Sequence, residues 1–242
     1  MAEHGGERVI VPAETVTSWL VTCGGRPQSH VDLAEPARLA FDYMRRAGDV
    51  LDALAPPGER LSVLHIGGAG LTLPRYVAVT RPTSRQVVLE PDAALTAMVR
   101  ERLPLPRRSG IKVRDVDGRS GLLAVRDGSF DACIVDAFDG EGSTPADLLG
   151  AGAAAEYARV LGPDGTLAMN LRDRVPHASV HEMAEALREH FRSVIIGAEP
   201  ATWKGRRDGN LLVVAGPTAR AADALAVAAR TRAAPYRIGV RL

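Results

Sequence analysis

The sequence LSVLHIGGAG at residues 61–70 decides the fold, because a buried strand ends there in a glycine-rich turn. Residues 61–66 are almost entirely apolar, which is typical of a parallel strand covered on both faces. Glycines in the turn permit a tight change of direction and a close approach of the backbone to a ligand. A helical pattern begins at Pro74. The stretch therefore predicts a strand, a turn and a helix at the centre of an α/β domain.

The same alternation continues after this turn. Strands are predicted at residues 86–90, 111–115, 130–136, 166–171, 191–197 and 210–216, and helical segments separate most of them. This pattern predicts a doubly wound, Rossmann-like and mostly parallel sheet. No convincing helix separates the last two strands, so we expect them to pair antiparallel. A seven-stranded sheet with one antiparallel strand near an edge is typical of the class I methyltransferase fold.

Residues 1–30 differ from the rest of the chain. Two runs rich in β-branched residues, 9–11 and 15–21, precede a Gly24-Gly25 turn signal. The sequence thus predicts a short hairpin-like segment at residues 1–30, followed by one Rossmann-like domain at residues 31–242.

Composition argues against several classes of function. The 242 residues have a net charge of +1, which favours neither nucleic acid nor a membrane surface as a partner. No apolar run approaches the roughly 20 residues of a membrane helix. The polar N-terminus lacks the apolar core of a signal peptide, so we expect a cytoplasmic protein. Cys23 and Cys133 are far apart and no metal-ligand spacing is visible, so no metal is expected.

Acidic residues follow two of the predicted strands after the glycine turn. Glu90 lies 23 residues after Gly67, close to the spacing of an acid that binds ribose hydroxyls. Asp117 and Gly118 follow the next strand, where a carboxylate can accept from an adenine amino group; Asp-Gly is also an ordinary turn. Carboxyl ends of parallel strands form the ligand-binding edge of such sheets. The sequence therefore predicts an adenosyl-nucleoside site that contains these acids and the turn Gly67, Gly68, Ala69 and Gly70.

Two further carboxylates follow the apolar strand at residues 130–136. Asp136 closes that strand and is a candidate general base or cation-binding group. Asp139 is either a second carboxylate for a cationic substrate or the start of an Asx turn.

In this order, the motifs resemble those of the polyamine aminopropyltransferase (spermidine synthase) family. The likeness spans roughly residues 28–216, and each part is short. The segments that resemble family motifs are Gly25–Gln28 (Gly-x-x-Gln), Tyr43 (Tyr-His-Glu), Ile66–Arg75 (the glycine loop and its Arg), Leu89–Asp92 (Glu-x-Asp), Asp117-Gly118, Asp136–Asp139 (Asp-Ser-Ser-Asp) and Pro145–Leu148 (Pro-Ala-x-x-Leu).

The resemblance implies the chemistry of an aminopropyltransferase. Asp136 would deprotonate the acceptor amine, assisted by Tyr43 and Asp139, and Gln28 and Asp139 would contact the acceptor. Pro145 and Leu148 would join the nucleoside site. The donor would be decarboxylated S-adenosylmethionine, the acceptor a diamine such as putrescine, and the protein a homodimer.

Two departures from the family leave alternatives open. Gly70 stands where the family has an Asp that binds the donor's primary amine, and Met44-Arg45 replace the His-Glu that would follow Tyr43. A bare glycine turn at a helix N-terminus accommodates the carboxylate of intact S-adenosylmethionine. A methyltransferase acting on an amine or another small acceptor is therefore the second hypothesis. A non-catalytic nucleoside-binding homologue is the third.

Overall fold

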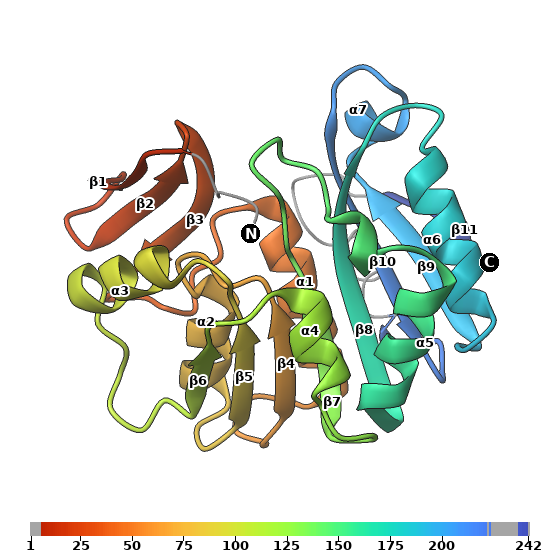
Figure 1. Ribbon diagram of the computed structural model, residues 1–242, viewed down its shortest axis with the longest axis horizontal. Helices are drawn as coiled ribbons and strands as arrows, with labels where there is room; N and C mark the ends of the chain where they lie inside the picture. The colour runs from red at the N-terminus through yellow and green to blue at the C-terminus, as the bar shows by residue number, and fades with distance from the viewer. Residues whose placement is uncertain (1–5, 222, 224–236, 242) are drawn as a thin grey trace.

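The computed structural model describes residues 6–221, 223 and 237–241, and its centre is a twisted mixed sheet (Figure 1). The strand order is β11-β9-β10-β8-β7-β4-β5-β6. Six strands run in one direction: β4 (Ser62–Ile66), β5 (Arg85–Leu89), β6 (Ile111–Arg114), β7 (Phe130–Val135), β8 (Leu161–Asp173) and β9 (Ser193–Ala198). The opposite direction is taken by β10 (Gly209–Gly216) and β11 (Arg237–Arg241).

Helices cover both faces of this sheet (Figure 1). One face packs against α4 (Gly118–Leu123), α5 (Gly150–Val160) and α6 (Ala178–Arg188), and the other against α1 (Asp42–Leu54) and α2 (Thr72–Thr80). Shorter or peripheral helices are α3 (Ala93–Arg102), η1 (Ala146–Leu148) and α7 (Pro200–Trp203). The two apolar layers bury the central strands, as their nearly continuous apolar sequences predicted.

The predicted sheet of the class I methyltransferase type is confirmed. Seven strands follow the order β6-β5-β4-β7-β8-β10-β9, and β10 pairs antiparallel with both β8 and β9. The described residues add an eighth strand, β11, at the β9 edge. The first helix, α1, begins at Asp42, after a segment of turns that follows β3.

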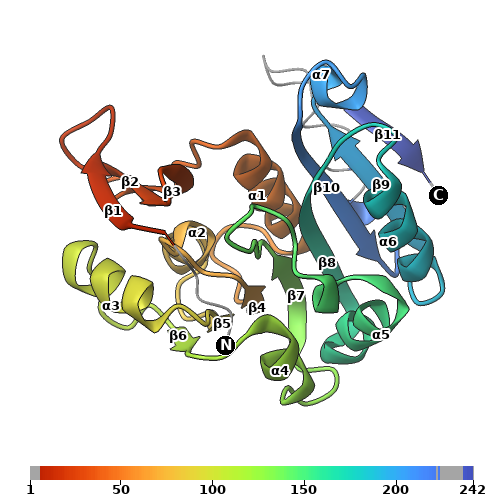
Figure 2. The ribbon, with the colours of Figure 1, turned by 45° about the horizontal axis from the view of Figure 1, so that its top comes forward.

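The N-terminal segment forms a separate antiparallel sheet of three strands, one more than the hairpin that the sequence predicted. Its strands are β1 (Arg8–Pro12), β2 (Ser18–Cys23) and β3 (Arg26–Asp32). Figures 1 and 2 place this sheet beyond the carboxyl ends of the parallel strands, beside α3. Since β3 begins Arg-Pro-Gln, it lacks the alternation of apolar residues that marks a strand in sequence.

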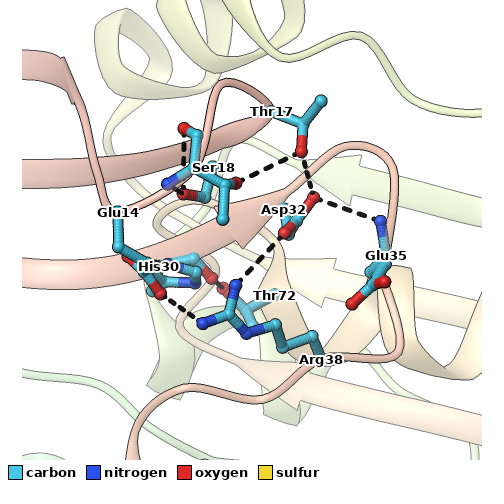
Figure 3. A network of polar contacts seen from close by, with 9 residues as sticks. Glu14, Thr17, Ser18, His30, Asp32, Glu35, Arg38 and Thr72 are labelled. Atoms are coloured by element: carbon cyan, nitrogen blue, oxygen red, sulfur yellow. Dashed lines mark hydrogen bonds and ion pairs between the residues drawn. The ribbon is translucent and has the colours of Figure 1, made fainter.

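A network of polar contacts fixes this sheet in place (Figure 3). Asp32 accepts from Thr17 Oγ1 at 2.9 Å and from the backbone N–H groups of Ala34 and Glu35. Thr72, the first residue of α2, donates its hydroxyl to the backbone carbonyl of His30 at 2.9 Å. The start of α2 is thereby tied to β3, which positions β3 over the site described next.

Candidate functional site

A cavity of about 930 Å³ lies at the carboxyl ends of β4, β5 and β7. Its walls come from both sheets: β3, the turn after β4, the loop after β7, and the ends of β8 and β10. Every predicted site residue except one lines it: Gln28, Tyr43, Gly67, Gly68, Ala69, Glu90, Asp117, Gly118, Asp136, Asp139, Pro145 and Leu148. Residues from distant parts of the chain are thus brought together.

The turn after β4 leaves no room for side chains at its first two positions. Gly67 has a φ of +91°, and a Cβ on it would lie 2.2 Å from the backbone oxygen of Asp136. A Cβ on Gly68 would lie 2.8 Å from Cγ1 of Val88. These contacts explain both glycines, and they place two backbone segments side by side at the cavity wall.

Glu90 supports this turn from the end of β5. Its Oε2 accepts from the N–H groups of Gly68 at 2.9 Å and Ala69 at 3.0 Å, and its Oε1 accepts from Asp92 N–H at 3.0 Å. The side chain is largely buried while it lines the cavity. Glu90 therefore orders the glycine turn in addition to presenting a carboxylate to a ligand.

Gly70 lies outside the cavity lining, unlike the rest of the predicted turn. Its N–H donates to Ser29 Oγ at 3.0 Å, and a Cβ here would lie 2.7 Å from Ser29 Cβ. The residue thus faces β2 and β3. The absence of a side chain at Gly70 permits the N-terminal sheet to pack against the turn.

Asp117 caps α4 at the next strand end. Its Oδ1 accepts from Ser120 N–H at 2.7 Å, and this backbone hydrogen bond lowers the pKa of the carboxyl group. A Cβ on Gly118 would lie 2.6 Å from Ile66 and 3.1 Å from Leu148. Asp117 and Gly118 therefore both form the turn that caps α4 and line the cavity, as predicted for the nucleoside site.

Asp136 lies half-buried at the end of β7, with two side-chain donors. Asn170 Nδ2 donates to Oδ1 at 2.8 Å, and Tyr43 Oη donates to Oδ2 at 3.4 Å. Burial raises the pKa of Asp136 to about 6, although both hydrogen bonds act to lower it. Burial and the neighbouring carboxylate also raise the pKa of Tyr43 well above its usual value. The carboxylate is thus poised to exchange a proton near neutral pH.

Asp139 is committed to its own loop. Its Oδ1 accepts from the N–H groups of Glu141 and Ser143, both at 2.9 Å. This is the Asx-type arrangement that the sequence left as one of two possibilities. Its charge nevertheless lines the cavity, three residues from Asp136.

Sequence reasoning missed three cavity residues with distinctive surroundings. Asn170 is 3% exposed, and its Oδ1 has no hydrogen-bond partner among the described residues. Arg26 and Arg172 bring positive charge to the cavity wall. Asn170 lies in the middle of an apolar strand pattern, and only its position beside Asp136 on β7 reveals its role. No local signal marks either arginine.

No group of three or more His, Cys, Asp or Glu side chains in the described residues is arranged to hold a metal ion. None of the helices in the same residues has the length and apolar character needed to cross a bilayer.

The solved structures that resemble this chain include spermidine synthases and methyltransferases. A probable spermidine synthase from Corynebacterium glutamicum is 29% identical, with a TM-score of 0.85, and the match covers 97% of this chain and 88% of that one. A spermidine synthase in complex with the transition state analogue AdoDATO is 15% identical, with a TM-score of 0.59 and coverage of 90% and 76%. Human methyltransferase-like protein 13 in complex with SAH is 17% identical, with a TM-score of 0.63 and coverage of 80% and 94%.

The first match confirms the predicted resemblance to spermidine synthases over nearly the whole chain. The other two share the fold of this chain. No protein-family model and no curated protein matches the sequence.

Proposed function

We propose that this chain is a transferase that moves an aminopropyl group from decarboxylated S-adenosylmethionine to the nitrogen of an amine. The observation that carries the proposal is Asp136, a half-buried carboxylate held by Asn170 and Tyr43 beside the glycine turn. The likeness to a probable spermidine synthase supports the aminopropyl group.

The proposed reaction is a displacement at the carbon attached to sulfonium. The amine nitrogen forms a bond to this carbon, the carbon–sulfur bond breaks, and sulfur keeps the electron pair as methylthioadenosine. The nitrogen must lose a proton, which passes to Asp136. The cavity walls supply orientation, and positioning is the main source of acceleration in such displacements.

The donor is held, in this proposal, along the ends of β4, β5 and β6. Glu90 and Asp117 offer carboxylate oxygens to the ribose and adenine, and the nucleoside lies against the backbone of Gly67 and Gly68, which line the cavity. The cavity volume of about 930 Å³ lies near the upper end of the usual range for small-molecule sites. It therefore leaves room for donor and acceptor together.

Methyl transfer from intact S-adenosylmethionine is the second candidate. The observation that favours it is that the turn presents no carboxylate to a donor amine: Gly67, Gly68 and Ala69 line the cavity, and Gly70 faces β3. The products distinguish the two reactions. Aminopropyl transfer releases methylthioadenosine, whereas methyl transfer releases S-adenosylhomocysteine.

The test is a product assay with each donor and a panel of primary amines. We expect methylthioadenosine to accumulate with the decarboxylated donor only when an amine is present. S-adenosylhomocysteine from intact donor would establish the second candidate instead. Binding of methylthioadenosine without turnover of either donor would identify a non-catalytic homologue.

The proposal includes the setting of the enzyme. We place the chain in a homodimer, as the family resemblance implied, and the reaction in the cytoplasm. Fractionation of the source cells and light scattering of the purified protein test these two points.

A further inference from the structure

Two guanidinium groups line the cavity beyond Asp136. Arg26 is the first residue of β3, and Arg172 lies near the end of β8. The position that a Cβ would take on Gly142 lies 3.0 Å from Nη1 of Arg26 and 3.2 Å from Nη1 of Arg172. The two nitrogens are therefore at most about 6.2 Å apart. Two positive charges from different sheets thus meet at one point of the wall.

These two charges lack a carboxylate partner in the described part of the chain. Arg26 Nη1 donates to the backbone carbonyl of Glu141 at 2.5 Å, which is a neutral acceptor. Arg172 has no ion pair among the same residues. By contrast Arg207, the third arginine of the cavity, is paired with Glu199.

The nearby carboxylates are poorly placed to bind a second ammonium group of a diamine. Asp42 pairs with Arg46 at 3.5 Å, and Asp208 pairs with Arg174 at 3.7 Å. Asp139 holds its own loop through two backbone N–H groups. The carboxylates of Asp42, Asp139 and Asp208 are therefore already engaged, whereas the two guanidinium groups have no carboxylate partner among the described residues.

Arg172 lies on the same strand as Asn170, the residue that contacts the proposed base Asp136. Arg172 follows Asn170 by two residues on β8, so both side chains leave the same face of the strand, roughly 7 Å apart along it. Asn170 contacts Asp136 directly. Arg172 is therefore within reach of the far end of an acceptor whose nitrogen lies at Asp136.

We propose, on the basis of the transferase function above, that the acceptor is an amine carrying an anionic group, a carboxylate or a phosphate, at its far end. Asp136 receives the amine, and Arg26 and Arg172 receive the anion. The guanidinium fork matches the oxygens of both anions. The substrate class is therefore an amino acid-like amine rather than a diamine.

Matched acceptors test this assignment. Cadaverine and δ-aminovalerate have the same chain length and differ in the charge of one end, as do putrescine and γ-aminobutyrate. We expect a higher kcat/KM for the carboxylate member of at least one pair. Arg172→Gln should lower this value about tenfold or more, as expected for loss of a charged hydrogen bond. Arg172→Glu should reverse the preference toward the diamine.

A matched control separates the site from general charge effects. Arg188 is an exposed arginine of α6, paired with Glu185 at 3.3 Å and outside the cavity, so Arg188→Gln should leave the preference unchanged. A wild-type preference for the diamines that Arg172→Gln leaves intact would overturn the proposal. The proposal would also be overturned if Arg172→Gln changed the preference between intact and decarboxylated donor but left the acceptor preference unchanged. The anion bound by Arg172 would then be the donor's carboxylate.

Calorimetry keeps this proposal distinct from the transferase function. The protein is saturated with methylthioadenosine and titrated with δ-aminovalerate and γ-aminobutyrate. Binding that depends on Arg172, without turnover of either donor, would support the anion site and contradict the proposed reaction. Absence of both binding and turnover with these two probes would overturn the anion site.

Discussion

At the scale of single residues, Asp136 shows how function and stability oppose each other. Burial raises the pKa of this carboxyl group to about 6, so the folded state holds its charged form at a cost above that pH. An Asn in its place keeps the shape and retains an acceptor for Asn170. The residue that the proposed chemistry needs is therefore one that the fold would be more stable without.

We predict that Asp136→Asn is inactive and more stable than the wild type. Turnover should fall at least a hundredfold, since positioned acid–base groups contribute about 10²–10⁴-fold. Thermal unfolding at pH 7.5 should shift upward, by the equivalent of about 1–3 kcal/mol for a shift of this size. Methylthioadenosine binding, measured by calorimetry, should persist. Turnover within threefold of the wild type would exclude Asp136 as the base.

The wild-type pH profile provides an independent measurement. Asp136 accepts a proton only in its charged form, so kcat/KM should fall below a midpoint near pH 6, the raised pKa of this group. A profile flat down to pH 4.5 would contradict the assignment.

At the scale of elements, the turn between β4 and α2 serves two partners. Its N–H groups at Gly68 and Ala69 donate to Glu90, and Gly70 packs against β3. Ala69 is the only one of the turn's first three residues with a side chain, and it lines the cavity with a φ of +38°. A change at position 69 therefore reaches the ligand, whereas a change at position 70 reaches the N-terminal sheet.

We predict that a carboxylate at position 69 changes donor preference, whereas a carboxylate at position 70 changes stability. Ala69→Asp should raise the preference for the decarboxylated donor about tenfold, because Asp tolerates a positive φ and would bind the donor's ammonium. Gly70→Asp should destabilise the fold by about 1–3 kcal/mol through overpacking against Ser29, with little change in donor preference. Donor kinetics and thermal unfolding measure both. A switch of donor in Gly70→Asp without destabilisation would show that position 70 faces the donor.

Glu90 should affect nucleoside binding both directly and through the glycine turn that it orders. Glu90→Ala removes a carboxylate that lines the cavity and the acceptor of three backbone N–H groups. We expect roughly ten- to hundredfold weaker binding of methylthioadenosine by calorimetry, as for the loss of charged hydrogen bonds. The matched control is Glu185→Ala, an exposed acid of α6 outside the cavity, which should bind normally. Equal affinities of the two variants would remove Glu90 from the site.

The sequence pattern marked the site residues that lie after strands but not those that lie within them. Glu90 and Asp136 were found because each directly follows a largely apolar strand, and Asp117 because it lies three residues after the end of β6. The carboxyl ends of parallel strands share one edge of the sheet. Asn170 and Arg172 lie within or near the end of a strand, where only pairing with β7 and β10 gives them meaning. The strand β3 escaped prediction because its burial comes from contacts with the glycine turn and α2 rather than from its own pattern.

At the scale of the whole molecule, two buried groups bind protons in opposite senses. His65 lies in β4, 2% exposed and hydrogen-bonded to Gln86, and burial lowers its pKa to about 4. Its contribution to stability is present above the unfolded pKa of about 6.5 and is lost as pH falls toward 4. Asp136 has a folded pKa of about 6, above its unfolded value, so its contribution is present at low pH and lost as pH rises through 6.

We predict that these two contributions cancel in the wild type between about pH 4.5 and 6, since one group releases a proton on folding and the other takes one up. Asp136→Asn leaves His65 uncompensated, so the free energy of unfolding should fall on acidification, by up to about 1.4 kcal/mol per pH unit. His65→Gln leaves Asp136 uncompensated, and the free energy should rise on acidification instead. Urea unfolding at several pH values measures all three slopes. If the two variants gave slopes of the same sign, the opposite pKa shifts assigned to His65 and Asp136 would be wrong.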